Sequence, residues 1–276
     1  MFKIVVCVKQ VPDTAGGVKF KADGTLDRGA MLAIMNPDDK AGLEAALRIK
    51  EKDPENVKVT LLTMGLPKAE DVLIEGIAMG ADDALLVTDR VLGGADTWAT
   101  SSTIAGALKN MEYDLIITGR QAIDGDTAQV GPQIAEHLAI PTISYAKEIN
   151  CDTENKTIEV KRLFDDGYMM VKAQLPALVT CLAELNEPRY MTPGRIFYAL
   201  DHKDELITVW GRANLDVDDS NIGLKGSPTK IAKASDKVAK GKGTTVTPES
   251  PTDAADYILN VLTDKNVIYE EEMIKK

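Results

Sequence analysis

The sequence contains few of the residues that build metal centres and covalent cross-links. Two of its 276 residues are histidine, His137 and His202, and three are cysteine, Cys7, Cys151 and Cys181, with no C-x-x-C spacing. Two distant histidines and three scattered thiols do not form a metal cluster. Thiols in this arrangement favour a reducing compartment over a disulfide framework. We therefore expect a cytoplasmic protein without a metal site.

Long hydrophobic runs and an excess of positive charge are also absent. No apolar stretch approaches the roughly 20 residues that a membrane-spanning helix needs. Residues 1–4 lead directly into a strand pattern, without the features of a signal peptide. The chain has 43 acidic and 32 basic side chains, which gives a formal net charge of −11. This negative charge disfavours nucleic acid as a partner. Hydrophobic residues make up 44% of the chain, which is enough for a packed core.

The familiar motifs of nucleotide enzymes are missing as well. Neither GxGxxG nor GxxxxGK[ST] occurs, and no serine or cysteine lies in a nucleophile motif. A classical NAD dehydrogenase that acts alone is therefore the weakest interpretation.

Short β-branched segments alternate with amphipathic ones through the first half of the chain. Strands are expected at 3–8, 57–64, 84–87 and 113–118, and helices from Asn36 onward, at 68–79, from Asp96 or Thr97 to 108, and at 126–138. This alternation predicts a doubly wound parallel sheet of the α/β, Rossmann-like, adenine-nucleotide-binding kind.

The pattern changes after Pro141. Short antiparallel strands are expected at 157–163, 168–174 and 177–180, and a small hairpin at 18–26. Residues 225–245 carry six lysines and one acidic residue, which is typical of an extended linker, and 252–264 form a capped amphipathic helix. We expect a nucleotide- or flavin-binding domain at 1–200. Residues 201–276 would form an extended C-terminal arm ending in a helix, packed on another chain or on its own domain.

Ligands of an open parallel sheet bind beyond the carboxyl ends of its strands. There, residues 119–131 form a polar, glycine-rich turn that leads into a helix. Its glycines permit close backbone approach, and free N–H groups at the helix start can hold a phosphate. Thr127 and Gln129 add polar side chains, and Arg120 would offset the charge of a phosphate or a reduced flavin. The alternative is an ordinary loop in which Asp126 only caps the helix.

A second segment, residues 93–100, has a similar character. Two glycines precede a helix start that carries Thr97 and Thr100, so a second phosphate contact is expected. Capping alone explains Asp96 and Thr97 equally well. The chain therefore has the features of a protein that binds a nucleotide-like ligand and leaves difficult chemistry to a cofactor.

Several segments resemble one known family. Residues 160–171 (VKRLFDDGYMMV), 175–180 (LPALVT) and 185–190 (LNEPRY) resemble the beta-subunit signature of electron transfer flavoproteins. Further matches, in the family's order, are 8–11 (VKQV), 35–37 (MNP) and 119–124 (GRQAID). The resemblance extends from about Phe2 to Ile196, with one departure at Met169, where the family usually carries Glu or Gln.

The resemblance implies a heterodimer with a larger alpha subunit that binds FAD. The smaller subunit holds AMP in one branch of the family. In the electron-bifurcating branch it holds a second FAD, which accepts hydride from NADH. Residues 125–133 (GDTAQVGPQ) and 96–100 (DTWAT) resemble the bifurcating branch, so FAD is expected here and AMP is the alternative.

No side chain is expected to act as an acid or base, and the chain would be an electron-carrier subunit. The implied cofactor-binding residues are Cys7, Val8, Asn36, Asp38, Thr63, Met64, Asp96, Thr97, Thr100, Gly119, Arg120, Gln121, Asp124, Gly125, Asp126, Thr127, Ala128, Gln129, Val130 and Gly131.

Partners are implied in the same way. They are the electron transfer flavoprotein alpha subunit, an acyl-CoA dehydrogenase, and a ferredoxin or flavodoxin. Residues 189–196 match the region that docks on partner dehydrogenases, with Pro193 in place of a leucine of the AMP branch. A non-redox nucleotide-binding module on a similar sheet is the competing interpretation. The lysine-rich arm and the 185–190 motif argue against it.

Overall fold

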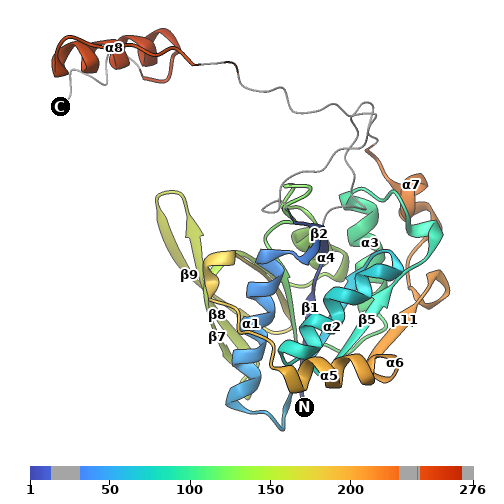
Figure 1. Ribbon diagram of the computed structural model, residues 1–276. Coiled ribbons are helices and arrows are strands. Elements are labelled where there is room, and N and C mark those ends of the chain that lie inside the picture. The colour runs from blue at the N-terminus through green and yellow to red at the C-terminus, as the bar shows by residue number, and fades with distance from the viewer. Residues whose placement is uncertain (14–31, 230–240, 242, 269–276) are drawn as a thin grey trace. The chain divides into compact units, whose positions relative to one another are not determined.

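The computed structural model describes residues 1–13, 32–229, 241 and 243–268 (Figure 1). The chain divides into two compact units, Met1–Ala232 and Lys233–Lys276. The hairpin expected at 18–26 lies outside the described residues, as does most of the linker expected at 225–245.

One large sheet forms the centre of the first unit. Its nine strands follow the order β11-β5-β4-β1-β6-β10-β7-β8-β9, and β2 and β3 form a separate antiparallel pair. The strands are β1 (Phe2–Cys7), β2 (Gln10–Pro12), β3 (Ala33–Met35), β4 (Val57–Met64), β5 (Asp83–Val87), β6 (Leu115–Gly119), β7 (Thr142–Asp152), β8 (Thr157–Phe164), β9 (Gly167–Gln174), β10 (Ala177–Cys181) and β11 (Ile207–Trp210). The helices are α1 (Pro37–Lys52), α2 (Glu70–Met79), α3 (Thr97–Leu108), α4 (Val130–Leu138), α5 (Pro193–Asp201), α6 (Lys203–Leu206), α7 (Gly223–Gly226) and α8 (Pro251–Asp264).

Helices cover both faces of this sheet, because successive strand residues point to opposite sides. Ile4 and Val6 of β1 belong to the core under α1 and α2, which lie on the near face in Figure 1. Val5 and Cys7 belong to the core under α3 and α4. Burying each large aliphatic side chain stabilises the fold by roughly 1.5–3 kcal/mol. The predicted doubly wound α/β fold with an antiparallel addition is confirmed.

The expectation that 177–180 form an antiparallel strand is wrong. β10 lies between β6 and β7 and is parallel to both, with Val179 beside Ile117 of β6. Its five residues are all buried, as expected for a central strand covered on both faces. The antiparallel part is β7-β8-β9 instead, in which β8 and β9 are the antiparallel strands that the sequence predicted at 157–163 and 168–174.

The compact unit extends past residue 200, where the sequence suggested a boundary. β11 pairs in parallel with β5, with Ile207 beside Ala84, and so extends the sheet by one edge strand. In the second unit, Ser250 caps α8 by accepting the N–H of Asp253 at 3.2 Å, and the predicted helix at 252–264 is confirmed. That this unit packs on another chain stays a prediction. Within the described residues, no helix is both long and apolar enough to span a bilayer.

Candidate functional site

The order of the strands changes direction at β1. The chain builds the sheet from β1 through β4 to β5, and then returns to place β6 on the other side of β1. Ligands of open α/β sheets bind at such a switch point, outside the carboxyl ends of the strands. The segments after Cys7 and Gly119 therefore flank the candidate site.

Asp39, in the first turn of α1, connects these two strand ends. Its Oδ2 atom accepts the N–H of Lys9 at 2.8 Å, and its Oδ1 atom accepts the N–H of Gly119 at 2.9 Å. Burial raises the pKa of this carboxyl to about 7, although hydrogen bonds from Asn36, Lys9 and Gly119 oppose the rise. Asp39 was not among the predicted site residues. The only signal in the sequence was two carboxylates at a helix start.

Two further residues at the start of α1 hold the glycine-rich turn. Asn36 donates from Nδ2 to the carbonyl of Gln121 at 2.8 Å and accepts the N–H of Ile123 at Oδ1 at 3.1 Å. Asp38 accepts the N–H of Ala183 at 3.0 Å and lies 3.5 Å from Nε of Arg120. Burial raises the pKa of Asp38, and the Arg120 charge opposes this. The side chains of Asn36 and Asp38, both predicted as site residues, therefore hold the turn in place from the start of α1.

The remaining carboxylates of the turn are also paired within the protein. Nζ of Lys9 lies 2.7 Å from Oδ1 of Asp124, and Gln121 donates from Nε2 to Asp126 at 2.9 Å. The ion pair offsets the charge of Asp124, which would otherwise repel an anionic ligand, whereas the neutral amide of Gln121 only engages Asp126 by a hydrogen bond.

The turn leaves a row of backbone donors free. Among the described residues, none accepts a hydrogen bond from the N–H groups of residues 127–131. Asp126 (φ 50°) and Ala128 (φ 52°) have the positive φ of the left-handed region, and Gln129, which follows Ala128, is right-handed. Alternating conformations of this kind aim successive N–H groups into a concave surface that binds anions.

The helix α4 begins at Val130, and the expected start at residue 126 is wrong. A residue in the left-handed region cannot belong to a right-handed helix, which excludes Asp126 and Ala128. The simpler interpretation, in which Asp126 caps the helix, is wrong as well, because Gln129 occupies the capping position.

The second predicted segment meets the first through a side-chain contact. Thr97, the first residue of α3, donates from Oγ1 to Oε1 of Gln129 at 2.9 Å. Asp96 caps α3 by accepting the N–H of Ala99 at 3.0 Å, so the capping role is confirmed. Thr100 lies one turn further along and is half-buried. A phosphate contact of Thr97 or Thr100 stays a prediction.

The strand ends of β1 and β4 supply the buried side of the site. Cys7 and Val8 are buried, and burial, with the Asp39 charge, raises the pKa of the Cys7 thiol to about 12. Thr63 is 1% exposed, and no described residue forms a hydrogen bond with its Oγ1 atom. A buried hydroxyl without a partner costs free energy, which a bound ligand would recover. Met64 follows it and is half-buried.

The glycines of the turn differ in what they face. A Cβ at Gly119 would lie 2.2 Å from Oδ1 of Asp39, and one at Gly131 would lie 2.7 Å from Oγ1 of Thr118. These two glycines permit close packing of the chain against itself, whereas the sequence had assigned the glycines to ligand approach. Gly125 has no atom within 4 Å of such a Cβ and faces open space.

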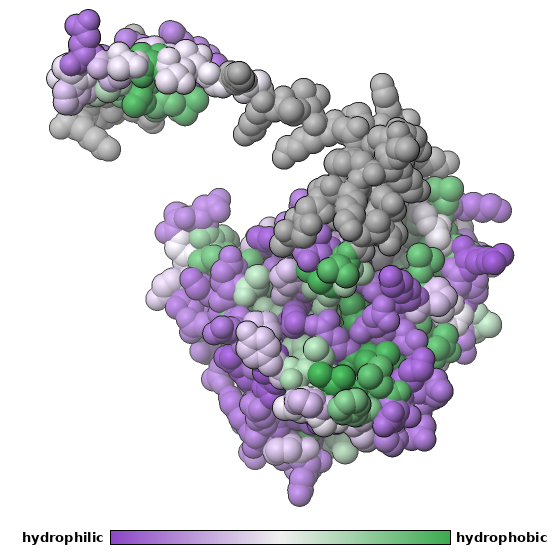
Figure 2. Space-filling view, viewed as in Figure 1, coloured by the Kyte–Doolittle hydropathy of each residue, from purple (hydrophilic) through white to green (hydrophobic). Residues whose placement is uncertain are grey.

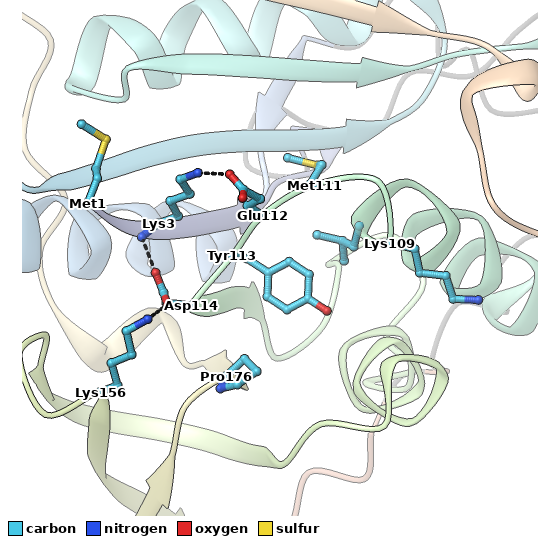
Figure 3. Close-up of a pocket in the computed structure, with 10 residues that line it drawn as sticks. Met1, Lys3, Lys109, Met111, Glu112, Tyr113, Asp114, Lys156 and Pro176 are labelled. Atoms are coloured by element: carbon cyan, nitrogen blue, oxygen red, sulfur yellow. Dashed lines mark hydrogen bonds and ion pairs between the residues drawn. The ribbon is translucent and has the colours of Figure 1, made fainter.

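A hollow of about 500 Å³ lies at the other end of the strands from the candidate site (Figure 3). It is lined by residues before or at the starts of β1, β6 and β10, including Lys3, Asp114 and Pro176. Asp114 accepts the backbone N–H of Lys3 at 2.9 Å and lies 2.8 Å from Nζ of Lys156, so these charges are paired within the protein. Its place at the amino ends of the strands does not match the position at which such sheets bind nucleotides.

The comparison with known proteins agrees with this fold and identifies the family. Residues 23–196 match the family described as "Electron transfer flavoprotein domain". The chain is 47% identical to the electron transfer flavoprotein subunit beta of Clostridium acetobutylicum, covering 96% of this chain and 99% of that protein. It is 43% identical to the caffeyl-CoA reductase-Etf complex subunit CarD of Acetobacterium woodii, over 96% and 100% of the two chains. It is 47% identical to the acryloyl-CoA reductase electron transfer subunit gamma of Anaerotignum propionicum, over 87% and 91%. With a match over most of its length, this chain belongs to the electron transfer flavoprotein family, as a beta subunit.

Proposed function

We propose that this beta subunit binds FAD at the carboxyl ends of β1, β4 and β6 and forms a heterodimer with an alpha subunit. When bound, FAD would accept hydride from NADH and pass the electrons on singly. One would go towards the alpha-subunit FAD and an acyl-CoA dehydrogenase, and the other towards a ferredoxin or flavodoxin. The chain itself binds, orients and shields the cofactor.

The observation that carries this proposal is the row of N–H groups at residues 127–131, which have no hydrogen-bond acceptor in the part of the chain that the structure describes. It lies at the switch point of the sheet and opens a helix, where the helix dipole adds to the attraction for phosphate oxygens. On the other side of β1, Thr63 contributes a buried hydroxyl to which no described residue forms a hydrogen bond. Both features fit the anionic and polar parts of an adenine dinucleotide.

Asn36, Asp38 and Asp39 hold the turn in place rather than meeting the ligand, because their side-chain oxygens are engaged by backbone N–H groups. The N–H groups of residues 127–131 would hold the phosphates. Thr97 and Gln129, which contact each other, would border the same ligand from α3 and α4.

The choice of FAD over AMP rests on the turn. Residues 125–131 are exposed in part, and Gly125 leaves open space beside them. A ligand larger than a mononucleotide would have room to extend past this point. AMP is the second candidate, and the two differ in flavin content.

Partners are proposed from the relatives and from the surface. Two relatives carry names that pair an electron transfer subunit with an acyl-CoA-type reductase. Hydrophobic surface is visible where α5 lies (Figure 2). The exposed large side chains of α5 are Phe197, Tyr198 and Leu200. We infer that this exposed face of α5 docks on an acyl-CoA dehydrogenase.

The test is a purified heterodimer, made by co-expression with its alpha subunit, in which FAD and AMP are quantified after release by acid. Two FAD per pair and bleaching of both flavins by NADH are expected. One FAD together with one AMP would replace the bifurcating role by the carrier role, and a colourless preparation would end the flavoprotein proposal.

A matched pair of variants tests the location. Asn36→Ala removes both hydrogen bonds to the turn, so retention of the beta-site cofactor should fall about tenfold. Lys58→Gln removes a partly exposed ion pair with Asp83 at the amino ends of β4 and β5, away from the turn, and should leave retention close to that of the unaltered protein. Equal retention in both variants would place the cofactor elsewhere.

A further inference from the structure

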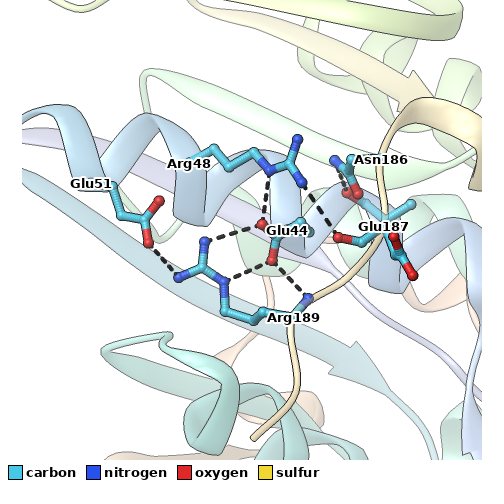
Figure 4. A network of polar contacts seen from close by, with 7 residues as sticks. Glu44, Arg48, Glu51, Asn186, Glu187 and Arg189 are labelled. Atoms are coloured by element: carbon cyan, nitrogen blue, oxygen red, sulfur yellow. Dashed lines mark hydrogen bonds and ion pairs between the residues drawn. The ribbon is translucent and has the colours of Figure 1, made fainter.

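A buried carboxylate lies at the middle of α1, away from the candidate cofactor site. Glu44 is 3% exposed and receives four hydrogen bonds (Figure 4). Arg189 donates from Nε at 2.7 Å, from Nη2 at 3.1 Å and from its backbone N–H at 3.1 Å. Arg48 donates from Nε at 2.8 Å. One side chain therefore holds both the backbone and the guanidinium of Arg189.

The carboxyl group of Glu44 and the guanidinium group of Arg189 favour their charged forms. Burial works to raise the pKa of the Glu44 carboxyl, but the hydrogen bonds from Arg189 and Arg48 outweigh it, and its pKa is lowered. The bond to Glu44 raises the pKa of the Arg189 guanidinium further. Removing one partner of such a pair leaves a buried charge uncompensated, so the contact resists opening.

The segment that contains Arg189 follows α1 along its length. Asn186 donates from Nδ2 to the carbonyl of Ala41 at 3.0 Å, and Arg48 donates from Nη2 to the carbonyl of Glu187 at 3.4 Å. Glu51 also pairs with Arg189 at 2.6 Å, but its side chain is 60% exposed. An exposed pair contributes little, so Glu44 is the main attachment of this segment.

The helix α5 begins four residues after Arg189. Arg195 donates from Nη2 to the carbonyls of Ile77, at 3.0 Å, and Ala81, at 3.4 Å, and so fixes α5 against the end of α2. Within α5, the side chain of Ala199 is fully buried, whereas that of Phe197 is 65% exposed. Glu44 holds the chain at Arg189, four residues before α5 begins.

We propose that Glu44 is a positioning residue that orients α5 for docking of the acyl-CoA dehydrogenase. This inference rests on the proposed function. Within the described part of the chain, the hydrogen bonds of the Glu44 side chain go to Arg48 and Arg189 and to no residue of the candidate cofactor site or of α5. It acts through Arg189 and the three residues that lead into the helix. Its effect therefore appears in recognition of the partner and not in cofactor content.

The test uses the full heterodimer with its cofactors and a purified acyl-CoA dehydrogenase as the electron acceptor. Glu44→Gln keeps the shape of the side chain and removes its charge. We expect the KM for the dehydrogenase to rise about tenfold with kcat and flavin content nearly unchanged. Amide hydrogen exchange should become faster in 186–200 and stay the same in 119–131.

Glu51→Gln is the matched control, because it removes the exposed member of the same network and should leave the KM unchanged. If Glu44→Gln does not fold, Arg189→Lys tests the same contact, because lysine keeps the charge but loses the two-nitrogen geometry. An unchanged KM with unchanged exchange in 186–200 would overturn the inference. Failure of the unaltered heterodimer to reduce the dehydrogenase would instead overturn the proposed partner.

Discussion

Oδ1 of Asp39 accepts the backbone N–H of Gly119 at 2.9 Å, and the two residues lie so close that a Cβ on Gly119 would stand 2.2 Å from that oxygen. The same carboxylate accepts the N–H of Lys9, so one buried side chain joins the carboxyl ends of β1 and β6. The row of free N–H groups begins eight residues after Gly119. The candidate site is therefore built on a contact that allows no additional atom.

Gly119→Ala is expected to destabilise the fold by about 2 kcal/mol or more, because its Cβ also meets backbone at Asp39 N, 2.9 Å away, which cannot move independently. Retention of the beta-site cofactor should fall with it. Thermal unfolding and the ratio of cofactor to protein measure the two effects. Gly125→Ala is the control, since open space surrounds that position. Equal melting temperatures for the two variants would contradict the packing at Gly119.

Asp39 also predicts a dependence of stability on pH. Burial raises its pKa in the folded protein to about 7, above the value of roughly 3.9 in an unfolded chain. The folded state therefore binds more protons than the unfolded state between these values. The stabilising contribution of this group is complete below the unfolded pKa and is lost as the pH rises through about 7, with a slope of up to about 1.4 kcal/mol per pH unit.

Asp39→Asn isolates the contribution of Asp39 to the pH dependence of the free energy of unfolding, because the other titrating groups, including Asp38, remain in both proteins. The free energy of unfolding of the unaltered protein minus that of the variant should decrease as the pH is raised from about 5 to about 8. Urea unfolding at several pH values measures it. A difference that is constant with pH would show that Asp39 titrates at its ordinary value.

The sequence predicted those parts of the structure that depend on neighbours in the chain. The apolar run of β1 and the Asp96 cap of α3 are confirmed, because a strand pattern and a capping bond to Ala99 are local. Asp39 was missed because its partners Lys9 and Gly119 are 30 and 80 residues away. No local pattern encodes such contacts.

The same limit explains the errors in the second half of the sheet. The buried run of β10 is compatible with either strand direction, and its parallel pairing with β6 and β7 follows from the long path through β8 and β9. The start of α4 was predicted too early, because the residue type of Ala128 gives no signal of its left-handed conformation, although aspartate, as at Asp126, adopts it more often than most residues. Alanine in particular seldom adopts that conformation.

The three cysteines are expected to be unreactive in the folded protein. Cys7, Cys151 and Cys181 are all buried, and burial raises the pKa of the Cys7 thiol to about 12 and of the Cys151 thiol to about 11. Because the thiolate is the reactive form, an aromatic disulfide reagent at mildly alkaline pH should label no thiol in the native protein and all three after denaturation. Rapid labelling of Cys7 in the native state would indicate that the end of β1 opens.

Two buried threonines provide a comparison that separates stability from ligand binding. Oγ1 of Thr63 has no hydrogen-bond partner among the described residues, whereas Oγ1 of Thr180 accepts the N–H of Tyr145 at 3.2 Å. Both side chains are 1% exposed, so their surroundings exclude water to the same degree. Valine has nearly the same shape as threonine and lacks the hydroxyl.

Thr63→Val should therefore leave the ligand-free protein as stable as before, or stabilise it by about 1 kcal/mol, because an unpaired polar group is removed from the interior. With FAD or AMP added, the same variant should bind more weakly, since the hydroxyl that we propose as a ligand contact is gone. Thr180→Val should destabilise the protein by about 1–2 kcal/mol with or without the nucleotide, because the Tyr145 N–H loses its acceptor. Unfolding followed with and without each nucleotide measures all four cases. If Thr63→Val lowers stability in the absence of nucleotide and leaves binding unchanged, the hydroxyl serves the fold alone, and the cofactor does not reach the end of β4.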